Sequence, residues 1–170
     1  LVLYAQICQP DEAERIARLC WDEIKGSFDV ESQRIRAIHC LRFLVDAFCS
    51  RRSAVKSFEG ELHRFIGEHV QGGDSLVMAK ICLEATGLLP EAETMPLLSL
   101  ALSGGNEWLQ ETAFRACRHL PRVEPALENV IISYVLAIPD VRFWRARKGI
   151  LLSLSLSEAL KGVGTIAQLR

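Results

Sequence analysis

Apolar residues recur at spacings of three and four along most of this chain, which is the pattern of amphipathic helices. One such run covers 30–48 and another covers 58–70. Residues typical of helix ends separate the runs, with Pro10 and Asn106 at starts and Gly26 at an end. Alternating apolar and polar positions, which indicate strands, are almost absent. The pattern therefore predicts an all-α chain.

Each predicted helix has one apolar face. The helix over 10–26 is expected to bury Ile16, Leu19, Cys20 and Ile24. In the helix over 106–120, Trp108 is expected to face inward. Further helices are predicted over 75–88, 90–104, 126–137 and 141–152.

A recurring pair, a small residue followed by an apolar one, marks four of these helices. The pairs are Cys40-Leu41, Cys82-Leu83, Ala113-Phe114 and Gly149-Ile150. Five residues before the small residue stands a larger apolar one, and these are Ile35, Val77, Trp108 and Trp144. The pairs are about thirty to forty residues apart, which is the length that two short helices and their turns need. This interval predicts antiparallel helical hairpins stacked as repeats.

With small and apolar residues recurring at this interval, the segment from about Glu31 to Leu156 resembles HEAT and armadillo repeats. Asp140 with Arg142 or Arg145 also resembles the aspartate and arginine that often mark the turn of a HEAT repeat. The resemblance implies a short α-solenoid, with the recurring pair on the first helix of each hairpin and a concave binding surface lined by the second. A compact orthogonal helical bundle is the alternative architecture.

The chain is expected to form a single domain over 1–170, because 170 residues suit one packed core. It starts Leu-Val-Leu-Tyr-Ala without Met, so it is expected to be a fragment of a longer protein. The Gly72-Gly73-Asp74 run predicts a hinge at 71–74. Apolar surface left at the ends of such a piece would favour self-association.

Composition narrows the classes of function. Hydrophobic residues make up 49% of the chain and charged residues 24%, as in packed soluble domains, and the formal net charge is −1. That near-neutral charge argues against a surface that coats nucleic acid or an anionic membrane. No apolar run is long enough to span a bilayer. The six cysteines lack metal-knuckle or redox-pair spacing, which predicts small buried hydrophobes in a cytoplasmic, reducing environment.

Positive charge is concentrated at 141–148, where four cations and two aromatic residues occupy about two helical turns. Arginines before this segment extend the patch. The residues predicted to bind a partner are Arg115, Arg118, Arg122, Arg142 and Arg145. A basic surface with aromatic residues suits protein docking and also suits the phosphates and bases of nucleic acid. The competing interpretation is a solvated outer face whose arginine stems cover apolar surface.

Two further groups of residues have structural explanations. Arg51, Arg52 and Lys56 follow a long helix, whose negative C-terminal end they would stabilise, and an anion site is the alternative. Glu59 and His63 share one helix face, but a zinc site needs three or four convergent ligands. No metal and no cofactor is therefore expected.

The predicted function is a non-catalytic helical-repeat scaffold for protein–protein interaction, as part of a larger adaptor, regulator or assembly. The sequence contains no glycine-rich phosphate loop and no nucleophile elbow, so an enzyme is not expected. The first alternative is a nucleic-acid-binding repeat with a basic groove, whose affinity would fall steeply with salt. The second is a helical regulatory domain of a larger nucleotide-driven switch.

Overall fold

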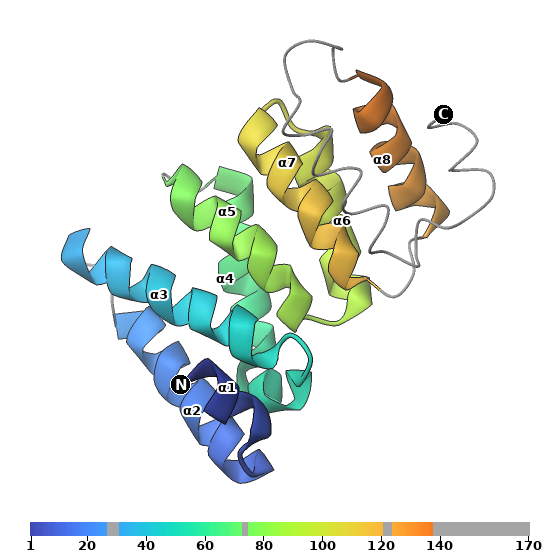
Figure 1. Cartoon of the computed structure of the whole chain (residues 1–170). Coiled ribbons are helices and arrows are strands. Elements are labelled where there is room, and N and C mark those ends of the chain that lie inside the picture. The colour runs from blue at the N-terminus through green and yellow to red at the C-terminus, as the bar shows by residue number, and fades with distance from the viewer. Residues whose placement is uncertain (27–30, 73–74, 121–123, 138–170) are drawn as a thin grey trace. The chain divides into compact units, whose positions relative to one another are not determined.

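The computed structural model describes residues 1–26, 31–72, 75–120 and 124–137, and every regular element in these ranges is a helix (Figure 1). The α-helices there are α1 (Val2–Ile7), α2 (Pro10–Gly26), α3 (Glu31–Phe48), α4 (Glu59–Gly72), α5 (Leu76–Ala85), α6 (Glu91–Ser103), α7 (Glu107–Ala116) and α8 (Pro125–Ala137). The 3₁₀ helices are η1 (Arg52–Phe58), η2 (Thr86–Leu88) and η3 (Cys117–His119). The all-α prediction is confirmed for this part of the chain, and the helix predicted over 141–152 falls beyond it.

The chain divides into two compact units, Leu1–Pro90 and Glu91–Arg170. Unit 1 contains α1 to α5, and unit 2 contains α6 to α8. The hinge predicted at 71–74 falls inside unit 1, between the end of α4 and the start of α5, and residues 73–74 are not among those described. The single domain predicted over 1–170 stays a prediction.

Helix boundaries follow the capping residues of the sequence. α2 starts at Pro10, whose missing N–H is not needed in a first turn. The hydroxyl of Ser75 accepts a hydrogen bond from the N–H of Met78 at 3.3 Å and so caps α5. At α7 the predicted cap is confirmed, because Asn106 Oδ1 accepts from the N–H of Trp108 at 3.0 Å.

Unit 1 is built from helical hairpins. α2 packs against α3 and α4 packs against α5, while α3 and α5 lie side by side and run in the same direction (Figure 1). α1 lies against α3 and α2, and η1 packs onto α2. The apolar stripe predicted for the helix over 30–48 is confirmed at Leu41, Leu44 and Phe48, which are fully buried, and is wrong at Ile35, which is 55% exposed. The face predicted for 58–70 is confirmed at Leu62 and Ile66.

In unit 2, α6 packs against both α7 and α8. The side-chain amide of Gln110 holds the turn between α6 and α7, because it donates to the carbonyl oxygens of Leu102 at 3.0 Å and Gly104 at 2.6 Å. The rings of Phe114 and Tyr134, with centroids 5.9 Å apart, connect α7 to α8. In both units the helix with the recurring pair packs against the helix before it. The prediction that it is the first helix of each hairpin is therefore wrong, because short turns join it to its predecessor.

The second member of each described pair is buried, but the larger apolar residue before the pair is exposed. The second members of the described pairs, at most 1% exposed, are Leu41, Leu83 and Phe114. The larger residues, with exposed fractions of 55%, 53% and 51%, are Ile35, Val77 and Trp108. The prediction that Trp108 faces inward is wrong, because five residues turn a helical side chain by about 140° away from the core position. The fourth copy, from Trp144 to Ile150, is not described.

The core face of α2 also differs from the predicted one. Leu19 is 65% exposed, and Ile16 and Cys20 are only half-buried. The buried positions are Ala13, Ala17, Trp21 and Ile24. This face has the same helical spacing, but its alanines allow close approach of neighbouring helices while the indole supplies a large buried area. The predicted face is therefore confirmed at Ile24 and wrong at Leu19, because the alanines and the indole lie on the buried side of α2.

Candidate functional site

Arg115, on α7, is the member of the predicted basic patch whose side chain is described, and it is exposed. Arg118 lies in η3, where its side chain is not described. Arg122, Arg142 and Arg145 fall outside the described ranges. The patch as a whole therefore stays a prediction.

Arg51, in the turn after α3, has hydrogen-bond partners at the end of α1. Arg51 Nη1 donates to the carbonyl oxygens of Cys8 at 2.8 Å, Ala5 at 3.3 Å and Gln6 at 3.4 Å. Because those carbonyls belong to the C-terminal end of α1, Arg51 caps α1 rather than the helix that precedes it in sequence. The expectation that it stabilises the preceding helix is corrected in this respect.

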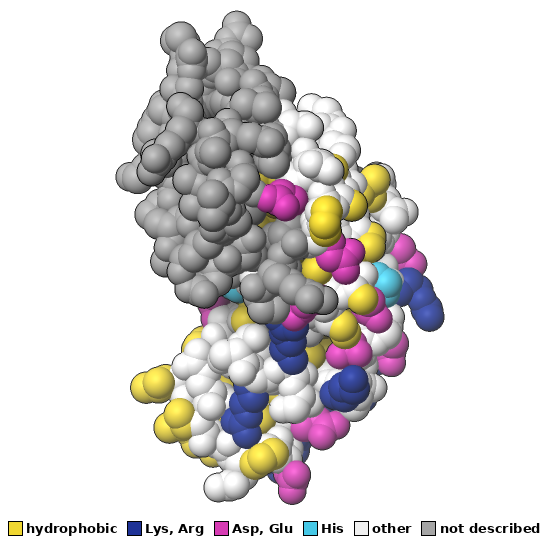
Figure 2. Space-filling model, turned by 90° about the vertical axis from the view of Figure 1, so that its right-hand side faces the viewer, with side chains coloured by type: hydrophobic (Ala, Val, Ile, Leu, Met, Phe, Trp, Pro, Cys, Tyr) yellow, Lys and Arg dark blue, Asp and Glu magenta, His cyan; other side chains and the backbone are white. Residues whose placement is uncertain are grey.

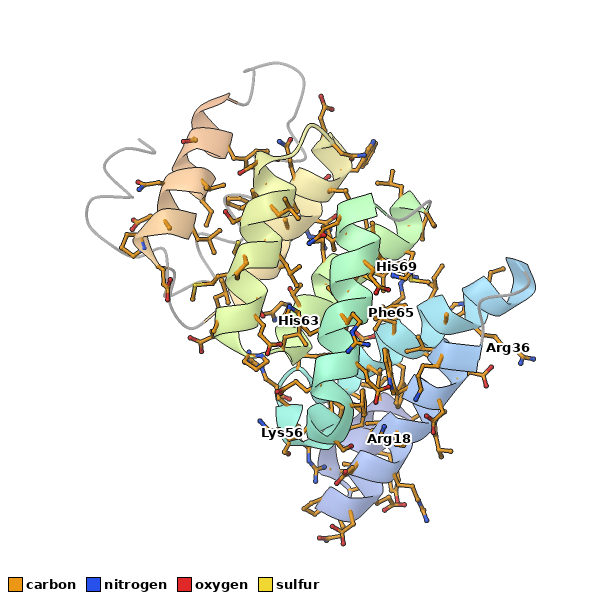
Figure 3. The ribbon with its side chains drawn as sticks, turned by 180° about the vertical axis from the view of Figure 1, so that it is seen from behind. Arg18, Arg36, Lys56, His63, Phe65 and His69 are labelled. Carbon is orange, nitrogen blue, oxygen red and sulfur yellow. The ribbon has the colours of Figure 1, made fainter. Side chains whose placement is uncertain are left out.

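The histidines of α4 lie on different sides of that helix. Figure 3 shows Phe65 and His69 one turn apart on one side and His63 on the other. His69 Nδ1 is 2.9 Å from the carbonyl oxygen of Phe65, and the two rings are 4.3 Å apart. Among the described residues, no group of three or more His, Cys, Asp or Glu side chains converges as metal ligands would.

An aromatic cluster joins α2 to η1 and α4. Trp21 is 2% exposed, and its ring stacks on Phe58 with centroids 5.4 Å apart and meets the edge of Phe65 at 5.6 Å. Arg18 covers the outer side of the cluster, since its guanidinium carbon lies 5.0 Å from the Phe58 ring centroid and its Nη2 donates to the Ser57 carbonyl at 3.1 Å. We call Arg18, Trp21, Phe58 and Phe65 the aromatic cluster.

Glu61 satisfies the polar edge of this cluster. Its Oε2 accepts hydrogen bonds from Trp21 Nε1 at 3.1 Å and from Lys25 Nζ at 3.3 Å. These two hydrogen bonds, the one from Trp21 first, hold the pKa of Glu61 below its ordinary value. Trp21 was not among the predicted core residues, although it follows Ala17 by four positions, which is a helical spacing. Because its polar and aromatic groups are satisfied within the chain, the aromatic cluster is a packing device rather than a binding site.

A stripe of exposed and half-buried residues runs along α3 and α5 on the side opposite their core positions. It consists of Ile35, Ile38 and Arg42 on α3 and of Val77, Lys80 and Glu84 on α5, and we call it the outer stripe. The two sets occupy matching positions relative to the recurring pairs, and the two helices are neighbours in unit 1. Each set begins with an aliphatic side chain that is about half exposed and ends with a charged one. This is the arrangement of an apolar contact with a polar rim.

In unit 2, α7 repeats the same surface order. Trp108 takes the position of the exposed aliphatic residue, a half-buried Glu111 follows one turn later, and Arg115 takes the position of the charged residue. Since Trp108 and Arg115 are seven residues apart, they lie on one side of α7. The predicted basic residue Arg115 therefore lies two turns along the same side of α7 from an exposed tryptophan, a residue type enriched at interfaces.

Charges of both signs are mixed on the described surface. Figure 2 shows Lys and Arg side chains interspersed with Asp and Glu on the face that it displays. Several cations are paired, as Lys25 is with Glu61 at 3.3 Å and Lys56 is with Glu59 at 3.6 Å. A phosphate backbone is usually bound by a surface with an excess of positive charge, which the described residues on the face in Figure 2 do not display.

Comparison with known proteins identifies no family for this chain. No protein-family model matches it, and the searches of curated proteins and of solved structures find no match. Over the described ranges, no helix has both the length and the apolar character needed to cross a bilayer.

Proposed function

We propose that this chain is a non-catalytic helical scaffold that binds another protein or peptide through the outer stripe. The observation that supports it is the exposure of the same position, five residues before the recurring pair, in α3, α5 and α7. Single exposed apolar residues are ordinary on protein surfaces. Their recurrence at one helical position favours a surface kept apolar for contact.

In this proposal the hairpins α2/α3 and α4/α5 are successive repeats of a short HEAT-like α-solenoid. Its support is the side-by-side, same-direction packing of α3 and α5, because equivalent helices of stacked hairpins pack in this way. The second helix of each hairpin carries the contact residues. The scaffold would act within a larger adaptor, regulator or assembly in the cytoplasm, where free thiols such as the six found here persist.

The energetics are sufficient for a specific contact. Complete burial of an aliphatic side chain is worth about 1.5–3 kcal/mol, and Ile35 and Val77 still expose about half of theirs. Arg42, Lys80 and Glu84 surround them with charges that would select the partner's orientation. Arg115, on the same side of α7 as Trp108, supplies a similar combination.

The test is a pull-down from nuclease-treated and untreated lysate, with the wild type and Ile35→Glu/Val77→Glu. Glutamate forms helix well and suits the N-terminal half of a helix, so the double variant is expected to remain folded. Leu19→Glu is the matched control, because Leu19 is exposed on α2 but lies outside the outer stripe. The recovered partner is then purified, and its Kd is measured directly for each variant.

We expect a protein partner that survives nuclease, binds the Leu19→Glu control normally and loses at least about tenfold in affinity with the double variant. Equal Kd values for all three proteins would exclude the outer stripe. Material that disappears with nuclease, binds more weakly at high salt and is lost in Arg115→Glu would instead identify the chain as a nucleic-acid-binding repeat.

A further inference from the structure

Cys20 on α2 and Cys40 on α3 meet across the first helical hairpin. A salt bridge sets the register of this hairpin, because Arg36 Nη1 lies 3.3 Å from Glu23 Oε1. Moving three residues back from Glu23 gives Cys20, and moving four residues on from Arg36 gives Cys40. Each step is about one helical turn away from the connection between the two helices. The two thiols therefore lie at the next level of the same hairpin, close enough for each to influence the pKa of the other.

The surroundings of the two thiols give them different roles. Burial, then the proximity of Cys40 and the hydrogen bond to it, raise the pKa of Cys20 to about 11. Burial and then the Glu23 carboxylate raise the pKa of Cys40 by more than the interaction with Cys20 and the charge of Arg36 lower it, so this pKa is also above its ordinary value. Cys40 is less buried than Cys20 and is the more readily deprotonated of the two thiols.

We propose that Cys20 and Cys40 form a redox modification site, which a small-molecule disulfide such as glutathione disulfide oxidises to a disulfide bond between α2 and α3. The Cys40 thiolate attacks one sulfur of the small disulfide, forms a mixed disulfide and releases a small thiolate. The Cys20 thiolate then attacks the Cys40 sulfur and releases the second small thiolate.

The exchange balances. In the first step the small disulfide's S–S bond breaks as the mixed S–S bond forms, and in the second the mixed bond breaks as the protein's S–S bond forms. The two protons of the protein thiols pass to the two released thiolates. The protein loses two electrons, and the small disulfide gains them.

Cys8, Cys82 and Cys117 are placed less favourably for this reaction. Cys82 and Cys117 are buried, and burial raises the pKa of each to about 12, so an oxidant has little access to a thiolate there. The Cys8 thiol donates to the carbonyl oxygen of Ala5 at 3.5 Å, within its own helical turn. Cys20 and Cys40 are both half-buried, so each retains some access to solvent.

The bond would stabilise the hairpin. It would join residues that are twenty positions apart in sequence and so restrict the unfolded chain, which favours the folded state. It would also tie α3 to α2. The inference is independent of the proposed function, since neither cysteine belongs to the outer stripe.

The test starts from the reduced full chain in glutathione disulfide, with remaining thiols alkylated at low pH before peptide mass spectrometry. Cys20→Ser and Cys40→Ser remove one partner each. Cys49→Ser is the matched control, because Cys49 is also half-buried and directly follows α3. The wild type and the Cys49→Ser control are expected to yield a peptide linked through Cys20 and Cys40. Their melting temperature should rise by at least about 4 °C on oxidation.

The rate of bond formation should rise about tenfold per pH unit below the thiol pKa, because the thiolate is scarce there. Three results would overturn the proposal: a bond between other cysteines, glutathione adducts without the Cys20–Cys40 bond, or a bond that forms only in denaturant. If serine disturbs a helix, as judged by circular dichroism, alanine replaces it. The linked peptide of the wild type decides the question in either case.

Discussion

The aromatic cluster and the outer stripe both contain large apolar side chains at helical spacing. Those of the cluster are mostly buried within unit 1, whereas Ile35 and Val77 of the stripe are about half exposed. In the cluster, Trp21 is buried against two rings, and its N–H donates to Glu61. In the stripe, Ile35 and Val77 leave about half of their surface exposed. The apolar residues of the cluster pack within unit 1, whereas those of the stripe keep the exposed surface on which the proposed contact depends. This difference can be tested by substitutions matched in chemistry.

The largest expected difference is between two tryptophans. Trp21→Ala should lower the free energy of unfolding by about 3–5 kcal/mol, because it leaves a cavity beside Phe58 and Phe65 and removes a hydrogen bond. Trp108→Ala should lower it by less than about 1 kcal/mol, since that ring is half exposed. Urea denaturation followed by circular dichroism measures both. Equal losses would contradict the distinction between cluster and exposed surface.

A second difference is expected within α3. Leu41→Ala should lower the free energy of unfolding by about 2–5 kcal/mol, because Leu41 is fully buried. Ile35→Ala should change it by less than about 1 kcal/mol, because alanine favours helix and Ile35 is half exposed. The same denaturation experiment applies. A cost at Ile35 as large as that at Leu41 would mean that the stripe packs within the chain.

The smallest effect concerns pH. The pKa of Glu61 is lowered by the hydrogen bonds from Trp21 and Lys25, so the carboxylate contributes stability above its unfolded pKa and loses it as pH falls through the folded value. Unfolding measured from neutral to acidic pH should therefore show a loss of stability in the wild type that is smaller in Glu61→Gln. Glu68→Gln, an exposed substitution on the same helix, is the control and should keep the wild-type profile. If stability depended on pH identically in all three proteins, ionised Glu61 would not stabilise the aromatic cluster.

Local features of the fold were predictable because they depend on neighbours in sequence. Asn106 caps α7, and α2 ends at Gly26, as the capping preferences indicate. The buried face of α4 was also predictable, because Leu62, Ile66 and Val70 are apolar residues four positions apart. The burial of Leu41 and Leu83 followed from the recurring pair in the same way.

The candidate site was less predictable. The basic patch was inferred from charge density, and of its side chains Arg115 is the one described, on the same side of α7 as Trp108. The exposed position before each pair was derivable from helix geometry, since five residues turn a side chain by about 140°. Whether another element covers that position was not derivable, because covering an outward apolar residue depends on elements far away in sequence. Arg51 shows the same limit, since its hydrogen-bond partners in α1 are more than forty residues distant.

By itself, the sequence determined that the described part of the chain is all-α, where many of its helices begin and end, and that Leu41, Leu83 and Phe114 of the recurring pairs lie in the core. Tertiary structure alone decided that Trp21 rather than Leu19 anchors α2, that Arg51 caps α1, and that Cys20 meets Cys40. The physical reason is one of range. Capping and periodicity act within a few residues, whereas burial and pairing depend on which helix faces are brought together in space.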